Sequence, residues 1–78
     1  MKWEEHIVSD NQILLGKPII KGTRISVENI MELYASGWNE DAILESYPNI
    51  SKTDIMAVFA YINDCMKLEQ FLPLPRSA

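Results

Sequence analysis

The chain has 78 residues, of which 47% are hydrophobic and 23% are charged, and its formal net charge is −4. This composition is ordinary for a globular protein and excludes low-complexity, collagen-like and disulfide-stapled chains. It predicts a single domain over residues 1–78 whose core supplies roughly 3–5 kcal/mol, so self-association or a partner protein is expected.

The chain contains one cysteine, Cys65, and one histidine, His6. These counts exclude an internal disulfide and a structural zinc site built from several Cys and His side chains. A lone cysteine suits a reducing compartment, and neither a signal peptide nor an apolar run of the ~18 residues that cross a membrane is visible. We therefore expect a cytoplasmic protein with no membrane contact, no metal and no cofactor.

The charges are unevenly distributed along the chain. Residues 1–10 carry a net charge of −2, residues 11–27 carry +3 and residues 28–72 carry −6. The basic region therefore centres on Lys17, Lys21 and Arg24. The negative total disfavours nonspecific binding of nucleic acid by the whole surface, although it is compatible with a local basic patch.

Residues 7–26 are predicted to form a short β element with turns. Apolar runs at residues 13–15 and 19–20 are each followed by turn-forming residues that include a glycine. Two or three very short strands fit this pattern. Strands of that length do not form a stable sheet alone, so helices must cover them or a second copy must pair with them.

Residues 26–70 are predicted to form three helices. The first follows Ser26, a good N-terminal cap, and stops at Gly37. The second follows Asn39, another good cap, and stops at Pro48. The resulting fold class is mainly α.

The third predicted helix begins after Ser51, where Asp54 is placed to complete a capping box. This helix is apolar on more than one side. One stripe contains Ile55, Val58, Phe59, Ile62 and Met66. A second stripe contains Ala57, Tyr61, Cys65 and Leu68, and it is widened by Met56 and Ala60. Either the helix is sunk deep in a small core, or it also lines an interface.

Residues 71–78 form a proline-containing tail. Phe71 and Leu74 are apolar, and Arg76 places a cation near its end. Prolines reduce the entropy that an extended segment loses when it docks. The tail is predicted either to bind a partner or to fold back on the core of its own domain.

No catalytic constellation is evident in the sequence. His6 has no nucleophile beside it, and Glu28 and Glu32 share a helix face in a manner typical of a solvated surface. The stretch from Gly16 to Thr23 is not a phosphate-binding loop, because its glycines are six residues apart and no lysine follows the second. We therefore expect that the chain is not an enzyme.

The second and third predicted helices have the spacing of a helix-turn-helix, with residues 48–50 as the turn. The start of the third helix offers DNA one cation, Lys52, and no Arg, Asn or Gln for bidentate reading of bases. Phosphate contacts are therefore expected mainly from the basic region. The candidate DNA-binding residues are Lys17, Lys21, Arg24 and Lys52.

The stretch from Gly16 to Ile25 reads GKPIIKGTRI, and Gly37-Trp38 and Tyr47-Pro48 follow it. Over about residues 7–62 this pattern resembles the bacterial family known as domain of unknown function 433. The resemblance implies a homeodomain-like bundle of three helices with a short N-terminal β element. It also implies that some members act as the antitoxin of a PIN-like ribonuclease toxin, while many members have no established function.

Two functions follow from these observations. The first is a non-catalytic, antitoxin-like module that binds a PIN-like ribonuclease and also operator DNA, although the tail is short for an antitoxin that wraps its toxin. The alternative is a homodimeric protein-interaction module with no DNA-binding role. Both predict a homo-oligomer. The candidate partner-binding residues are Ala57, Tyr61, Leu68, Phe71, Leu74 and Arg76.

Overall fold

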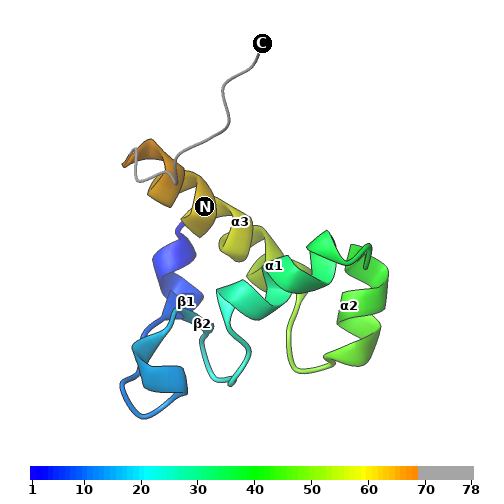
Figure 1. Ribbon diagram of the computed structural model, residues 1–78, viewed down its shortest axis with the longest axis horizontal. Coiled ribbons are helices and arrows are strands. Elements are labelled where there is room, and N and C mark those ends of the chain that lie inside the picture. The colour runs from blue at the N-terminus through cyan, green and yellow to red at the C-terminus, as the bar shows by residue number, and fades with distance from the viewer. Residues whose placement is uncertain (69–78) are drawn as a thin grey trace.

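The structure, a computed structural model, describes residues 1–68. Within these residues the chain is mainly helical, with three α-helices and one short antiparallel sheet of two strands (Figure 1). In chain order the elements are η1 (Trp3–Glu5), β1 (Ile7–Val8), η2 (Leu14–Gly16), β2 (Ile19–Ile20), α1 (Val27–Ala35), α2 (Glu40–Ser46) and α3 (Lys52–Lys67). The predicted class, mainly α with a short N-terminal β element, is confirmed.

The three α-helices begin where their capping residues predict. Each cap side chain accepts a hydrogen bond from the backbone N–H three residues later, at 2.9 Å for Ser26, 2.8 Å for Asn39 and 3.2 Å for Ser51. These bonds satisfy amides that have no partner within the helix. At α3 the Asp54 carboxylate also accepts from the Ser51 N–H at 2.9 Å, so the predicted capping box is present.

The sheet differs in part from the predicted pattern. Ile7 pairs with Ile20 and Val8 with Ile19, so the first strand lies before the apolar run at residues 13–15. That run is not a strand, because Leu14 and Leu15 have φ values of 50° and 57° and form a left-handed turn with Gly16. The non-local pairing of residues 7–8 with residues 19–20 is what organises the N-terminal third of the chain.

The turn at Gly22-Thr23 has a structural explanation. Gly22 has a φ of 80°, a conformation that glycine adopts without strain. The buried Thr23 hydroxyl donates to the Ile20 carbonyl at 2.7 Å and accepts from the Ile25 N–H at 2.9 Å. The threonine therefore ties the end of β2 to the residue that leads into α1.

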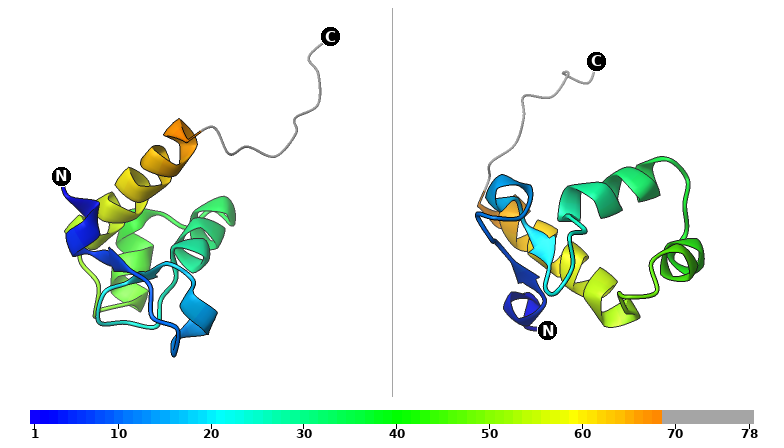
Figure 2. Two further views of the ribbon diagram at one scale, coloured as in Figure 1. Left: turned by 90° about the vertical axis from the view of Figure 1, so that its left-hand side faces the viewer. Right: turned by 90° about the horizontal axis from the view of Figure 1, so that it is seen from below.

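The core consists mainly of isoleucine. Its fully buried large side chains are Ile19, Ile20, Ile30, Ile43 and Val58. The helix α3 runs through the middle of the fold and contacts η1 and β1 on one side and α1 and α2 on the other (Figure 2). Because it is covered from two directions, α3 needs apolar residues on more than one side.

His6 contacts the start of α3. Its Nδ1 atom lies 3.0 Å from Oδ1 of Asp54, and both side chains are partly buried. Asp54 thus holds the start of α3 through Ser51 and also contacts the segment that leads into β1. The Asp54 carboxylate therefore links the N-terminal segment to the start of α3.

Replacing Asp54 with alanine is expected to lower the free energy of unfolding by about 1–2 kcal/mol, because the capping box and the His6 contact are lost together. Asp54→Asn keeps an oxygen that can accept from the Ser51 N–H, so it should lose less. Asp41→Ala, in the exposed first turn of α2, is the matched control. Urea unfolding followed by circular dichroism measures all three, and equal losses for Asp54→Ala and Asp41→Ala would contradict this role.

Candidate functional site

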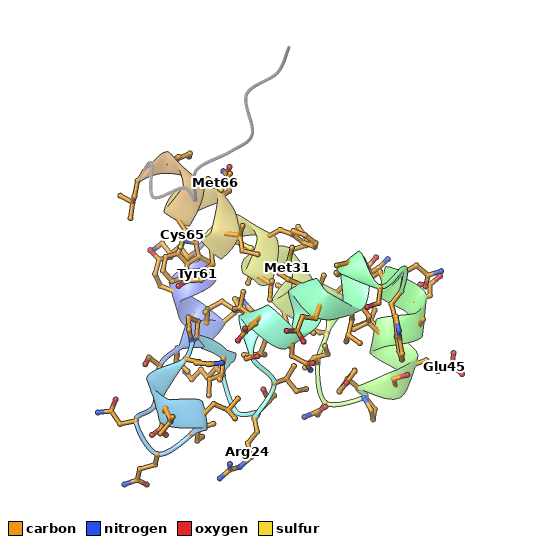
Figure 3. All side chains as sticks on the ribbon, viewed as in Figure 1. Arg24, Met31, Glu45, Tyr61, Cys65 and Met66 are labelled. Carbon is orange, nitrogen blue, oxygen red and sulfur yellow. The ribbon has the colours of Figure 1, made fainter. Side chains whose placement is uncertain are left out.

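The residues predicted to contact DNA lie on either side of β2, except Lys52, which is the first residue of α3. The Lys17 Nζ atom lies 2.8 Å from Oε2 of Glu28, and the hydrogen bond to Glu28, followed by its charge, raises the pKa of Lys17. Lys21 and Arg24 are exposed and have no ion-pair partner among residues 1–68. Arg24 points away from the body of the fold (Figure 3).

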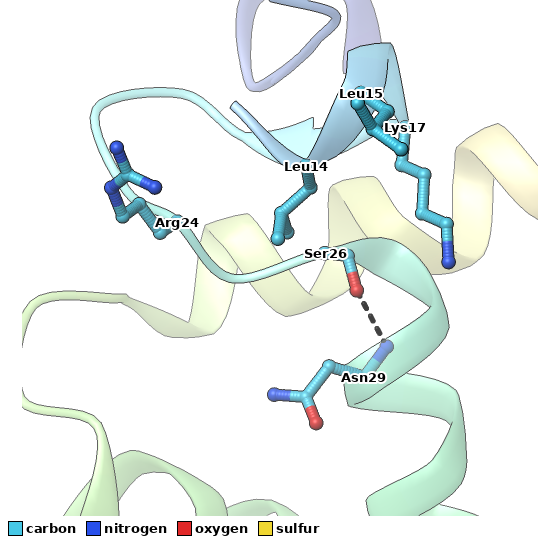
Figure 4. A pocket seen from close by; sticks show the side chains of 6 residues that line it. All are labelled: Leu14, Leu15, Lys17, Arg24, Ser26 and Asn29. Carbon is cyan, nitrogen blue, oxygen red and sulfur yellow. Dashed lines mark hydrogen bonds between the residues drawn. The ribbon is translucent and has the colours of Figure 1, made fainter. Parts of the chain in front are cut away.

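A wide, open hollow of about 500 Å³ lies between the η2 turn and the start of α1 (Figure 4). Its lining residues are Leu14, Leu15, Lys17, Arg24, Ser26 and Asn29. In Figure 4 the Leu14 side chain lies between those of Arg24 and Lys17. The hollow therefore groups Lys17 with Arg24 beside two leucines, whereas Lys21 and Lys52 lie outside it.

Ala57 is wrongly placed in the predicted partner-binding stripe of α3. It is fully buried in the core together with Ile55 and Val58. A small side chain at this position lets α3 lie close to its neighbours, so it cannot also face a partner. The rest of that stripe is only partly covered.

Tyr61 and Leu68, the other predicted partner-binding residues on α3, flank a hollow near the end of this helix. Trp3 packs its ring edge-on against Tyr61, with centroids 4.9 Å apart, and its Nε1 donates to Asp64 Oδ2 at 2.6 Å. Burial, followed by the neighbouring Cys65 thiol, raises the pKa of Tyr61. Leu68 is 68% exposed at the rim. Trp3 thus covers the part of the stripe around Tyr61, while Leu68 stays exposed.

The predicted tail contacts lie outside the described residues. Phe71, Leu74 and Arg76 all follow residue 68.

Another exposed apolar surface of α3 combines Phe59 and Met66 from the predicted stripe of Ile55 with Met56 from the edge of the second stripe. Phe59 is 43% exposed, and Met56 and Met66 are 59% and 51% exposed. Phe59 packs edge-on against Tyr34 of α1, with ring centroids 5.2 Å apart. Spacing alone does not find this surface, because its exposure depends on which other elements pack against α3.

Within residues 1–68, no group of three or more His, Cys, Asp or Glu side chains is placed to hold a metal ion. In the same part of the chain, no helix has the length and apolar character needed to cross a bilayer.

Comparison with known proteins gives one result. A family model described as protein of unknown function (DUF433) matches residues 7–62. Searches of curated proteins and of solved structures found no match.

Proposed function

Because this chain belongs to the DUF433 family, whose description names no activity, we propose its function from its surfaces. We propose a non-catalytic, antitoxin-like module with a homeodomain-like arrangement of three helices. Its partner is a PIN-like ribonuclease, bound through the α3 apolar face, which we define as Met56, Phe59 and Met66. The exposure of these three side chains on one helix is the observation that carries the proposal.

The α3 apolar face has the character of a binding surface. Aromatic and methionine side chains are enriched in the buried centres of protein interfaces, where a few of them supply most of the affinity. Phe59 is held in place by its edge contact with Tyr34, so it loses little side-chain freedom on binding. Methionine adapts to irregular partner surfaces on either side of it. The face therefore supports a protein partner.

The same face argues against base reading by α3. A helix that reads bases presents Arg, Asn, Gln or Lys to the major groove, whereas here the exposed side offers Met56 and Phe59. Lys17, one of the proposed phosphate contacts, is already paired with Glu28. Binding of operator DNA stays a prediction, and the surface favours a protein partner over it.

The test uses a PIN-like ribonuclease encoded beside this chain, if the genome holds one, and the full chain as its inhibitor. Phe59→Asp is expected to weaken the complex by about tenfold or more, equivalent to about 1.4 kcal/mol, because a carboxylate is buried against an apolar partner surface. Titration calorimetry and inhibition of ribonuclease activity measure the loss. Leu15→Asp, at the most exposed leucine of residues 1–68, is the matched control and should bind like the wild type.

Two results would contradict the proposal. Full affinity of Phe59→Asp alongside loss of affinity in Leu15→Asp places the partner on another surface. An absence of both binding and inhibition with the wild-type chain removes the ribonuclease as the partner. If Phe59→Asp instead changes the sedimentation of the isolated chain, the same face supports the alternative, a homodimeric interaction module.

A further inference from the structure

The η2 turn presents an apolar side chain to solvent in a conformation that bulky residues rarely adopt. Leu14, Leu15 and Gly16 have φ values of 50°, 57° and 81°, and Leu15 is 96% exposed. The Ser9 hydroxyl donates to the Gly16 carbonyl at 2.6 Å, and the Gly16 N–H donates to the Ile13 carbonyl at 3.1 Å. Strain held by such a network, with a leucine at its tip, is a reason to look for a contact outside the monomer.

The surroundings of this turn are basic. Residues 11–24 carry three cations and no acidic residue, namely Lys17, Lys21 and Arg24. Lys17 is paired with Glu28, so Lys21 and Arg24 provide the free positive charge. Leu15 and Arg24 line the same hollow, and Lys21 lies three residues before Arg24; we call these three residues the basic loop surface. An occupant of this surface needs an apolar side chain and carboxylates next to it.

The chain itself carries a surface with that chemistry. Residues 25–51 contain five acidic residues and no Lys, Arg or His, and the acidic residues are Glu28, Glu32, Glu40, Asp41 and Glu45. On α2, Asp41 and Glu45 are exposed and one helical turn apart, so their like charges repel. Trp38, just before α2, is also exposed. We call Trp38, Asp41 and Glu45 the acidic α2 surface.

The two surfaces face away from each other within one molecule. The η2 turn and α2 lie at opposite ends of the fold in Figure 1. In Figure 3, Glu45 points outward from α2, whereas Arg24 points away from the body of the fold on the loop between β2 and α1. No ion pair joins the two surfaces within residues 1–68, and both are exposed and open to contact with a second chain.

We propose that the basic loop surface of one copy docks on the acidic α2 surface of a second copy, with Leu15 against Trp38. Contact between two basic loop surfaces would place cations of one copy against cations of the other. Contact between two acidic α2 surfaces would place carboxylates against carboxylates, and both contacts are repulsive. Only the mixed contact pairs opposite charges. Because its two halves are different surfaces, the contact is head-to-tail and builds rings or open chains of copies. This inference does not depend on the proposed ribonuclease partner.

The test is sedimentation velocity of the full chain over a wide concentration range. The loop variant Leu15→Asp/Arg24→Glu and the α2 variant Asp41→Ala/Glu45→Ala are each expected to weaken self-association by about tenfold or more. All four positions are exposed, and circular dichroism verifies that both variants fold. Raising the salt concentration should weaken the wild-type assembly, since the Debye length falls from about 10 Å at 0.1 M to about 3 Å at 1 M.

A mixture of the two variants gives the decisive result. Each variant keeps one intact surface, so an equimolar mixture is expected to form a complex of two chains that cannot grow further. A two-fold contact would not behave in this way, because each variant would carry its defect into the shared interface. Asn63→Asp, at an exposed side chain of α3 that belongs to neither surface, is the control, and it should assemble like the wild type.

Several results would overturn the inference. These are a wild-type chain that stays monomeric at every concentration, a mixture that stays monomeric, and a loop variant that assembles like the wild type. Loss of assembly in Phe59→Asp would place the interface on α3 instead. If Lys21→Ala/Arg24→Ala lowers the retention of duplex DNA but leaves sedimentation unchanged, the basic loop surface contacts nucleic acid and not a second copy.

Discussion

Replacing Ile30 with alanine is expected to leave a large fraction of the chain unfolded at room temperature. Ile30 lies in α1, has no exposed surface, and belongs to the core cluster that also contains Ile43 and Val58. Truncation of a buried isoleucine to alanine costs about 2–5 kcal/mol, because apolar contacts are lost and a cavity remains. A domain of this size has only roughly 3–5 kcal/mol to lose.

Far-UV circular dichroism and urea unfolding measure this effect. Leu15→Ala is the matched control, since the same kind of truncation at a 96% exposed side chain removes few contacts within the monomer. Its free energy of unfolding should stay within about 0.5 kcal/mol of the wild type. An Ile30→Ala protein that loses less than about 1 kcal/mol would show that the core repacks around the missing atoms, or that self-association supplies much of the stability.

The local signals in the sequence predict the helices well. Ser26, Asn39 and Ser51 each cap a helix, because a side-chain oxygen can satisfy a free amide wherever the chain turns into a helix. Such signals act over three or four residues and do not depend on the rest of the fold. This is why the starts of α1, α2 and α3 are readable from the sequence alone.

The N-terminal third is less predictable, because non-local contacts decide it. The strand at Ile7–Val8 exists only because residues 19–20 lie beside it, and a run of two apolar residues gives no periodicity. The left-handed turn at Leu14 and Leu15 opposes the intrinsic preference of leucine. The turn is held by hydrogen bonds from the Ser9 hydroxyl to the Gly16 carbonyl and from the Gly16 N–H to the Ile13 carbonyl. The spacing of apolar residues in the sequence does not reveal these bonds.

The candidate surfaces on α3 show a related limit. Spacing correctly indicates two apolar stripes, but it cannot tell which neighbours cover each. The N-terminal η1 brings Trp3 onto Tyr61 from 58 positions away in the chain, while Phe59 stays partly exposed beside Tyr34 of α1. Ala57 is buried for the same reason, because α3 is covered from two directions. Which stripe is a surface is a property of the tertiary fold.

Thr23 stands at the junction that connects the β element to α1, and its hydroxyl forms two buried hydrogen bonds there. The Ile20 carbonyl also accepts from the Thr23 N–H at 3.0 Å, so it keeps a partner if the hydroxyl is removed. The Ile25 N–H has the Thr23 hydroxyl as its acceptor within the described residues, and Ile25 is buried. Loss of the hydroxyl therefore leaves the buried Ile25 N–H without a hydrogen-bond acceptor.

Thr23→Val keeps the shape of the side chain and is expected to lower the free energy of unfolding by about 1–3 kcal/mol, the cost of leaving a buried N–H without an acceptor. Thr23→Ser retains the hydroxyl and should lose less than half as much. Thr53→Val, at an exposed threonine in the first turn of α3, is the matched control and should change stability by less than about 0.5 kcal/mol. Urea unfolding measures the three variants, and hydrogen exchange of the Ile25 amide localises the effect.

That amide should exchange faster in Thr23→Val than in Thr23→Ser, because only serine still supplies the acceptor. Equal exchange and equal stability in the two variants would mean that the hydroxyl does not hold the turn.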